Sequence, residues 1–343
     1  MLSAALSWKD HAYDTSMQKQ LLLYVGGEGG TGKSQIIKSI VAGMDLINRK
    51  EEIILLAPTG AAADNINGNT IHTSLGISIG KKRPPKASPR VKRLWRNKTI
   101  MVIDEISMVD LRMLNTINNH CKSAKSLDRN SSDLFGGLPI VLFMGDFFQF
   151  PPVKGRALWK SPKPDNDDDA NGQMIWHRFT DVIILEEQMR QAKDPSFRSL
   201  LHRARHGELT EEDCALLNSK VITSLFAPEL QKAVAISKRN KRRRQINRLK
   251  MEHFARSRSQ RLYMFPIQVD RIASASSSTL HIRDLLQQED SGTKVPFQGL
   301  LLYTPGMPLM ILANICTPLG LVNGARGTAS TIVVDPSGMF FIL

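Results

Sequence analysis

The sequence predicts an α/β protein in which a doubly wound parallel sheet is followed by a second, different domain. Short apolar segments recur through the first half of the chain, and helical patterns separate them. These segments lack polar alternation, which is typical of strands that a parallel sheet buries on both faces. After about residue 190 the pattern changes to helices, a basic stretch and glycine-punctuated strands, so a second domain is expected there.

The elements of the first half follow from this apolar pattern. Strands are expected at residues 21–25, 53–57, 100–103, 140–144 and 182–185. Helical patterns at Ser34–Asn48 and Val109–Ala124 lie between strands. The order strand, helix, strand predicts parallel pairing with helices on both faces of the sheet.

The elements of the second half are less uniform. Helices are expected at residues 196–206 and 211–219, with Thr210 as the N-cap of the second. Residues 232–237 are expected to form a strand, and strand patterns from residue 306 onward predict a small antiparallel β unit.

The chain has 343 residues and a net charge of +14, concentrated in two basic stretches, Lys81–Lys98 and Lys238–Lys250. Such an excess favours a polyanionic partner, although charge also serves solubility alone. Residues 165–169 are acidic and are expected to form a surface loop without chemistry. No apolar run reaches the roughly 18–20 residues that cross a bilayer, so no membrane partner is expected. Three widely spaced cysteines fit neither a zinc pattern nor a disulfide framework.

A glycine-rich segment between an expected strand and an expected helix matches the phosphate-binding P-loop pattern. Its residues are Gly27, Glu28, Gly29, Gly30, Thr31, Gly32, Lys33 and Ser34. Backbone N–H groups of such a loop bind phosphates at the helix N-terminus. Lys33 is then expected to reach the β- and γ-phosphates of ATP, and Ser34 to bind Mg²⁺.

Two acids end the expected strand 100–103. Asp104 is expected to hold Mg²⁺, and Glu105 to polarise the attacking water. An acid pair after an apolar strand is also a common strand exit or helix cap. Its position downstream of a P-loop favours the catalytic interpretation and predicts a P-loop ATPase.

Further segments, in order, resemble the motifs of the Pif/RecD group of superfamily 1B DNA helicases. Their wording is similar to that of helicases from eukaryotic helitron-like elements. They are Ala57–Thr73, Asp104–Met108, Gly145–Val153, Leu185–Gln191 and Gly306–Gly327. The fourth segment carries Met189 where the family frequently has tryptophan. The Asp104–Met108 segment reads DEISM, a form found in the family.

The resemblance implies a RecA-like motor domain over residues 1–189, with a small basic insertion at 76–98. It implies a partial second RecA-like domain over residues 190–343, with a small β-barrel-like insertion at about 295–343. The implied activity is ATP-dependent 5′-to-3′ translocation on single-stranded DNA and unwinding, with ATP and Mg²⁺ bound. The implied roles are DNA repair, recombination and telomere maintenance, on single strands and DNA junctions. The implied location is the nucleus, with the mitochondrion as a further location within the family.

The same resemblance assigns roles to residues outside the P-loop. Gln149 is expected to sense the γ-phosphate, although a hydrogen-bonded loop amide is the ordinary alternative. Arg190 is the expected arginine finger, supplied from the second domain, whereas an isolated arginine is by default a surface residue. The expected DNA contacts are Thr59, Gly60, Thr70, His72, Phe148 and Asn240.

The family's final motifs are missing from this sequence, which predicts a truncated product. Two alternatives to an active helicase therefore stay open. One is a catalytically weak ATP- and DNA-binding remnant of a mobile-element helicase. The other is a P-loop ATPase that remodels RNA or protein.

Overall fold

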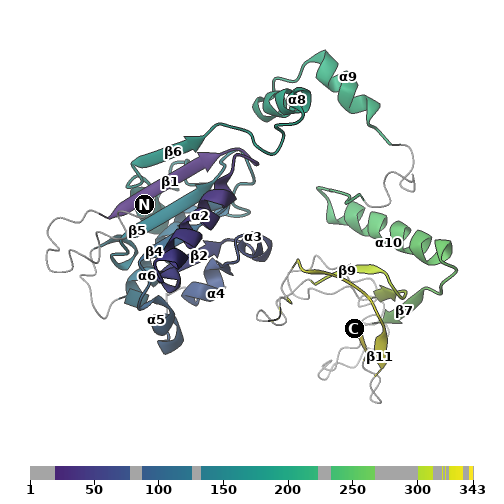
Figure 1. Ribbon diagram of the computed structural model, residues 1–343, viewed down its shortest axis with the longest axis horizontal. Helices are drawn as coiled ribbons and strands as arrows, with labels where there is room; N and C mark the ends of the chain where they lie inside the picture. The colour runs from purple at the N-terminus through teal and green to yellow at the C-terminus, as the bar shows by residue number, and fades with distance from the viewer. Residues whose placement is uncertain are drawn as a thin grey trace. The chain divides into compact units, whose positions relative to one another are not determined.

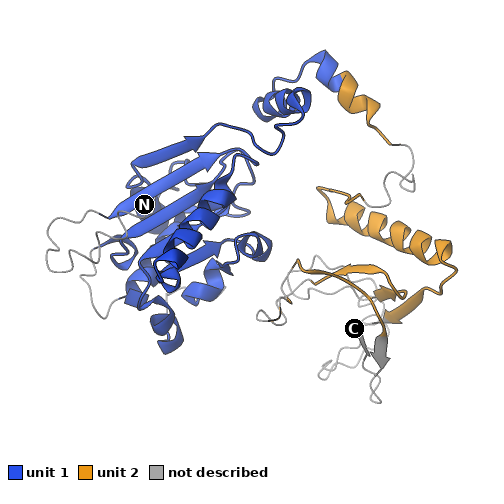
Figure 2. Cartoon of the chain, viewed as in Figure 1, with its two compact units in different colours: residues 1–214 blue, residues 215–343 orange. Residues whose placement is uncertain are grey.

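The computed structural model describes residues 20–77, 87–125, 133–222, 233–266, 300–311, 319, 321, 324–334 and 340–342. The chain divides into two compact units, residues 1–214 and residues 215–343 (Figure 2). The first unit continues beyond residue 189 because helix α8 (Pro195–His206) belongs to it. The predicted start of a second motor domain at residue 190 stays a prediction.

The first unit is built on a six-stranded sheet with the order β3-β2-β4-β5-β1-β6 (Figure 1). The strands are β1 (Leu21–Gly27), β2 (Ile53–Ala57), β3 (Asn69–Thr70), β4 (Ile100–Ile103), β5 (Ile140–Gly145) and β6 (Asp181–Leu185). Every pair is parallel. The expected α/β class and the five expected strands are therefore confirmed.

Helices cover both faces of this sheet, because neighbouring residues of a strand point to opposite faces. Leu23 and Val25 of β1 belong to the apolar cluster of one face, whereas Leu22 and Tyr24 belong to that of the other. The first face packs against α2 (Lys33–Leu46) and α3 (Gly60–Asn65). The second packs against α4 (Ile71–Leu75), α5 (Pro89–Trp95), α6 (Leu111–Lys125) and α7 (Asp167–Trp176). Short 3-10 turns occupy Lys50–Glu52, Ile106–Met108 and Leu134–Gly136.

The predicted acidic loop at residues 165–169 is wrong for residues 167–169, because these residues begin helix α7. Asn166 caps the helix by accepting a hydrogen bond from the Asp169 N–H. Asp168 accepts a hydrogen bond from the Asn115 side chain of α6 at 2.9 Å, and the buried Asp169 accepts one from the Lys163 N–H. Acids in the first turn favour a helix start, and here they also join α7 to its neighbours.

The second unit contains a long basic helix and short antiparallel strand pairs. Helix α9 (Glu211–Ser219) crosses the division between the units, and its expected cap is confirmed, since Thr210 Oγ1 accepts from the Asp213 N–H. Helix α10 (Asn240–Ser257) holds most of the second basic stretch. The strand pairs are β7 (Tyr263–Pro266) with β8 (Leu300–Tyr303), β9 (Pro308–Met310) with β10 (Arg326–Thr328), and β11 (Ile332–Val334) with β12 (Phe340–Ile342).

Two expectations for this half have different outcomes. The strand expected at 232–237 is wrong over its described part, since residues 233–237 take no regular structure. Antiparallel pairing, expected from residue 306 onward, is observed, whereas the barrel-like insertion stays a prediction.

Candidate nucleotide-binding site

The glycine-rich loop connects the end of β1 to the start of α2. Gly30 has a left-handed backbone conformation, with φ of 102°, and a Cβ there would overlap the Gln188 side chain. Gly32, with φ of 94°, caps α2 in the same conformation. Only glycine adopts both conformations without steric cost, so the backbone wraps tightly around the helix N-terminus.

Three neighbouring strands bring their polar residues to this loop. Strands β1, β5 and β4 are adjacent and parallel, so their carboxyl ends meet at one edge of the sheet. The P-loop follows β1, Asp104 and Glu105 follow β4, and Asp146 follows β5. In open α/β sheets the crevice outside these ends is the usual ligand site.

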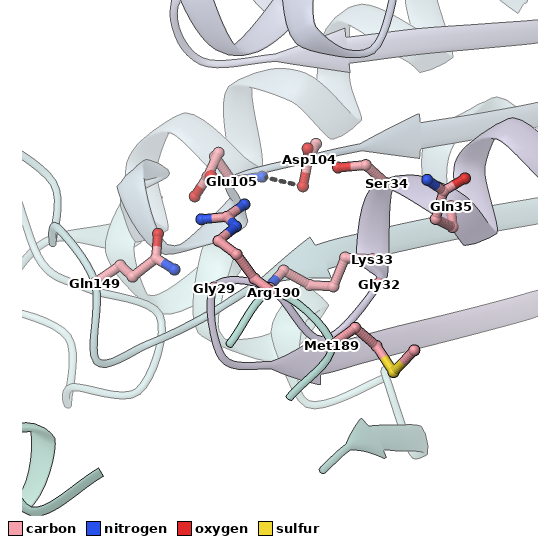
Figure 3. Close-up of a pocket in the computed structure, with 11 residues that line it drawn as sticks. Gly29, Gly32, Lys33, Ser34, Gln35, Asp104, Glu105, Gln149, Met189 and Arg190 are labelled. Atoms are coloured by element: carbon pink, nitrogen blue, oxygen red, sulfur yellow. Dashed lines mark hydrogen bonds between the residues drawn. The ribbon is translucent and has the colours of Figure 1, made fainter. Parts of the chain in front are cut away.

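A pocket of about 480 Å³ lies at this edge (Figure 3). The P-loop, the two acids after β4, and the segments after β5 and β6 all contribute to it. Its lining residues are Gly29, Gly30, Gly32, Lys33, Ser34, Gln35, Asp104, Glu105, Gln149, Met189 and Arg190.

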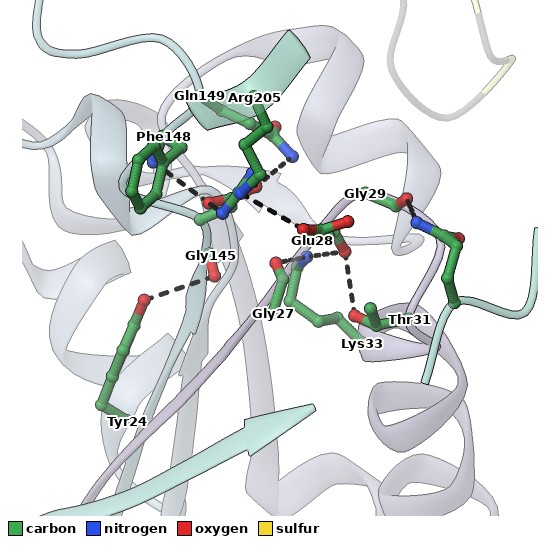
Figure 4. Close-up of polar contacts among 12 residues, drawn as sticks. Tyr24, Gly27, Glu28, Gly29, Thr31, Lys33, Gly145, Phe148, Gln149 and Arg205 are labelled. Atoms are coloured by element: carbon green, nitrogen blue, oxygen red, sulfur yellow. Dashed lines mark hydrogen bonds and ion pairs between the residues drawn. The ribbon is translucent and has the colours of Figure 1, made fainter. Parts of the chain in front are cut away.

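The lysine of the loop lies among carbonyl oxygens and carboxylates. Lys33 Nζ donates hydrogen bonds to the carbonyls of Gly27 at 2.6 Å and Glu28 at 2.9 Å (Figure 4). Burial lowers the pKa of Lys33, while the nearby Asp146, Asp104 and other carboxylates act to raise it. A cation is thereby held at the centre of a loop whose backbone geometry suits phosphate.

The two acids after β4 both line the pocket. Asp104, 7% exposed, accepts a hydrogen bond from the Glu105 N–H at 2.9 Å. Burial raises the pKa of both Asp104 and Glu105, and Lys33 acts against that increase. Glu105 also has a left-handed backbone, with φ of 53°, an unusual conformation for a non-glycine residue and one often found at functional sites.

The donor set of the pocket fits Mg²⁺. Ser34 offers a hydroxyl oxygen and Asp104 a carboxylate oxygen, and both residues line the pocket. Mg²⁺ prefers hard oxygen ligands, few of them from protein, with the remainder from water and phosphate. Ser34 and Asp104 are therefore the residues that would hold the ion.

The segment after β6 lies directly against the P-loop. The backbone N–H groups of Met189 and Arg190 both donate to the Gly30 carbonyl, at 3.0 and 3.2 Å. Gln188 Nε2 donates to the Gly29 carbonyl at 2.8 Å. These bonds place the Arg190 side chain in the pocket, where Figure 3 shows it pointing toward Glu105. Arg190 and the P-loop belong to the same compact unit, residues 1–214, and the arginine-finger role of Arg190 stays a prediction.

Gln149 lines the pocket from the loop after β5. Its side-chain amide donates to Asp146 Oδ2 at 3.3 Å, and its backbone N–H donates to the Asp146 carbonyl at 2.9 Å. Gln149 is therefore held close to the phosphate loop by the acid that begins its own segment.

Arg205 of α8 joins the P-loop to the Asp146 segment, and sequence reasoning did not identify it. Its two terminal nitrogens donate to the two carboxylate oxygens of Asp146, each at 2.6 Å, and its Nε lies 3.3 Å from Glu28 Oε1 (Figure 4). The guanidinium also stacks 4.3 Å above the Phe148 ring. Burial acts to raise the pKa of Asp146, but the hydrogen bonds from Arg205 and Phe148 outweigh it and lower that pKa. No motif marks Arg205, because the contact joins residues 59 positions apart.

Four of the proposed DNA-contacting residues lie at the carboxyl ends of the paired parallel strands β2 and β3. Thr59 and Thr70 cap α3 and α4, where their hydroxyls accept the N–H groups of Ala62 and Thr73. Gly60 is the first residue of α3. His72 is partly buried in α4, and burial lowers its pKa. The DNA contacts of these four residues stay predictions.

The other DNA candidates are exposed. The Phe148 ring is 65% exposed, whereas Phe147 packs against Tyr24 at 5.4 Å between ring centroids. Phe150 is 81% exposed. Phe147 therefore packs against the core, whereas the rings of Phe148 and Phe150 are exposed. Asn240 is the first residue of α10, which belongs to the second unit, and its DNA contact stays a prediction.

The fold and the pocket define a P-loop nucleotide-binding domain of the RecA-like type. The family model described as PIF1-like helicase matches residues 9–214, more than half of the chain, and the chain therefore belongs to the PIF1-like helicase family.

Two relatives illustrate the extent of the match. The chain is 32% identical over 200 residues to the ATP-dependent DNA helicase RRM3 of Saccharomyces cerevisiae. This alignment covers 57% of this chain and 26% of that protein. It is 28% identical over 344 residues to the ATP-dependent DNA helicase PIF1 of Homo sapiens. That alignment covers 97% of this chain and 48% of the human protein. The chain thus spans less than half the length of each relative.

Solved structures of Pif1 helicases share the fold. A Pif1 from Bacteroides bound to single-stranded DNA has a TM-score of 0.63 and 24% identity, over 95% of this chain and 71% of that chain. Pif1 from Candida albicans has a TM-score of 0.65 and 22% identity, over 98% of this chain and 69% of that chain.

Among the described residues, no helix is long and apolar enough to span a membrane.

Proposed function

We propose that this chain binds ATP with Mg²⁺ at the P-loop pocket and couples hydrolysis to 5′-to-3′ movement on single-stranded DNA, as the motor part of a DNA helicase. The observation that carries the proposal is the convergence of Lys33, Asp104, Glu105 and Arg190 on one pocket at the ends of adjacent strands. Membership of the PIF1-like helicase family and the net charge of +14 support DNA as the partner.

Each pocket residue has a separate task in phosphoryl transfer. The Lys33 ammonium would bind the β- and γ-phosphates, and the loop N–H groups would hold the remaining phosphate oxygens. Bound Mg²⁺ would neutralise phosphate charge beside Ser34 and Asp104.

Glu105 would orient the attacking water and accept its proton. Burial, which raises the pKa of this carboxyl group, increases its basicity as long as it is ionised at neutral pH. Arg190 would stabilise charge that develops on the γ-phosphate, a contribution worth about 10³–10⁵ in rate for arginine fingers. Gln149, which lines the same pocket, would link this event to the loop that carries the exposed Phe148.

Strand displacement tests the proposal on the whole chain. Duplexes with a 5′ single-stranded tail, a 3′ tail or blunt ends would be mixed with the chain, MgATP and a trap strand. The proposal expects displacement of the 5′-tailed duplex only, and no displacement by a Lys33→Ala variant. Displacement of 3′-tailed duplex would contradict the direction. ATP hydrolysis stimulated by RNA and not by DNA would favour an RNA-remodelling ATPase instead.

The broader assignments rest on the family alone. Roles in repair, recombination and telomere maintenance, and a nuclear location, stay predictions for this chain.

A further inference from the structure

A group of metal-binding side chains lies beside the nucleotide pocket. His202 and His206 are four residues apart on α8, so they share one face of the helix, and their ring centroids are 4.7 Å apart. Glu28 approaches them from the P-loop. One ligand atom from each of the three residues lies within 4.8 Å of the other two.

The proposed ATP chemistry uses none of these three side chains. Arg205 is anchored mainly on Asp146, with two contacts of 2.6 Å, and its contact with Glu28 is longer, at 3.3 Å, and involves one oxygen. A carboxylate has two oxygens, so Glu28 can face Arg205 with one and a metal ion with the other. Both histidine side chains are exposed, which leaves their ring nitrogens accessible.

The ligand chemistry selects the class of ion. Two imidazoles and one carboxylate suit Zn²⁺, Co²⁺ or Ni²⁺, whereas Mg²⁺ prefers oxygen ligands alone. With metal–ligand bonds near 2.0–2.1 Å, tetrahedral ligand atoms lie about 3.4 Å apart. The three atoms must therefore close by up to roughly 1–1.5 Å from the upper bound of 4.8 Å. Rotation of exposed side chains provides this movement at little cost.

From this geometry we infer that Glu28, His202 and His206 form a transition-metal site, which ties α8 to the phosphate loop. Three protein ligands leave at least one position for water. The site joins two segments whose sequence positions differ by more than 170 residues, so binding links a helix far along the chain to the loop that would hold ATP.

A consequence follows for catalysis, and this part rests on the proposed function. A metal that holds α8 against the P-loop opposes any step of the ATP cycle in which the two separate. Zn²⁺ at site-saturating concentration is then expected to slow ATP hydrolysis.

Direct binding is the primary test. The metal-free full chain would be titrated with Co²⁺, followed by its visible absorption, and with Zn²⁺ by calorimetry. One equivalent is expected to bind, with Co²⁺ bands that are lost in the His202→Ala and His206→Ala variants. Each of these variants should lower affinity by more than about tenfold, since even loss of an outer-shell partner costs 10–100-fold. The matched control is His177→Ala, which removes a histidine outside the group and should leave binding unchanged.

Two outcomes of the titration would overturn the inference. Binding that survives His202→Ala and His206→Ala would place the metal elsewhere. Unchanged affinity in Glu28→Gln would mean that the helix alone binds metal and that α8 is not tied to the loop.

Hydrolysis provides a separate readout. Zn²⁺ should inhibit the wild type and the His177→Ala variant equally, and His202→Ala much less, which separates the site from direct binding of Zn²⁺ to ATP. Inhibition of the same extent in all three would contradict the catalytic consequence. No hydrolysis by the Zn²⁺-free wild type with saturating MgATP and single-stranded DNA would refute the proposed function, whereas the Co²⁺ spectrum would still decide the metal site.

Discussion

Removal of the Arg205 guanidinium is expected to destabilise the first unit and to weaken nucleotide binding. In Arg205→Ala, the Asp146 carboxylate loses two charge-assisted hydrogen bonds of 2.6 Å. The Asp146 side chain is only 3% exposed, so water cannot replace the lost partner fully. The Phe148 N–H at 3.0 Å and the Gln149 side chain at 3.3 Å still bind it.

The size of the effect follows from these contacts. Breaking a buried ion pair by removing one partner costs about 3–5 kcal/mol. Because Arg205 is partly exposed and Asp146 keeps two hydrogen bonds, about 2–4 kcal/mol is expected here. For a unit of this size, each kcal/mol of lost stability lowers the melting temperature by about 2–4 °C. The melting temperature of Arg205→Ala should therefore be roughly 5–15 °C below that of the wild type.

Tryptophan fluorescence measures this loss selectively, because all four tryptophans belong to the first unit. Arg198→Ala, an exposed arginine on the same helix, is the matched control and should change stability by less than about 0.5 kcal/mol. Arg205→Lys keeps the charge but not the two-pronged geometry, and an intermediate loss is expected. Equal stability of Arg205→Ala and Arg198→Ala would refute the assigned role of Arg205.

The same pair predicts a pH dependence. The pKa of Asp146 is lower in the folded chain than its ordinary value. The ionised Asp146 carboxylate therefore stabilises the folded chain fully above the unfolded pKa, and this contribution is lost as pH falls through the folded pKa. The stability difference between wild type and Arg205→Ala should therefore be constant near neutral pH and shrink below about pH 4. A difference that grows on acidification would contradict this assignment.

Three further substitutions test the core and the pocket. Asp104→Asn removes a buried charge and should raise the stability of the nucleotide-free chain by about 0.5–2 kcal/mol. The same substitution should abolish hydrolysis. Lower stability of this variant in thermal unfolding would contradict the first expectation. Trp95→Phe leaves the Ser74 carbonyl without its 2.9 Å indole partner and opens a cavity, so urea unfolding should show a loss of about 2–4 kcal/mol. Gly172→Ala puts a Cβ against the Leu111 carbonyl, a backbone atom, and should cost about 3 kcal/mol or more in the same assay; a neutral result would show that α6 and α7 separate easily.

Much of the first unit was predictable because its signals are local. The strands are continuous apolar segments, and burial on both faces requires that pattern. The P-loop and the acid pair were predictable because both lie where strands end, and parallel strands bring those ends together.

The remainder depends on contacts that no local pattern encodes. Gln188 and Arg205 reach the P-loop region from segments remote in sequence, and a lone glutamine or arginine gives no signal of such a contact. The acidic residues 167–169 look like a solvated loop until Asn115 and the backbone of Lys163 provide their partners. The segment 233–237 has strand-like composition, but among the described residues no strand pairs with it.

Steady-state ATP hydrolysis by the full chain, with and without single-stranded DNA, tests the central claim most directly. The matched variants are Lys33→Ala in the P-loop and Lys38→Ala, an exposed lysine of α2. The proposed function predicts hydrolysis that single-stranded DNA stimulates, that Lys33→Ala abolishes and that Lys38→Ala leaves unchanged. Hydrolysis that persists in Lys33→Ala, or no hydrolysis by the wild type at saturating MgATP and DNA, would contradict the assignment of this pocket as a DNA-stimulated motor site.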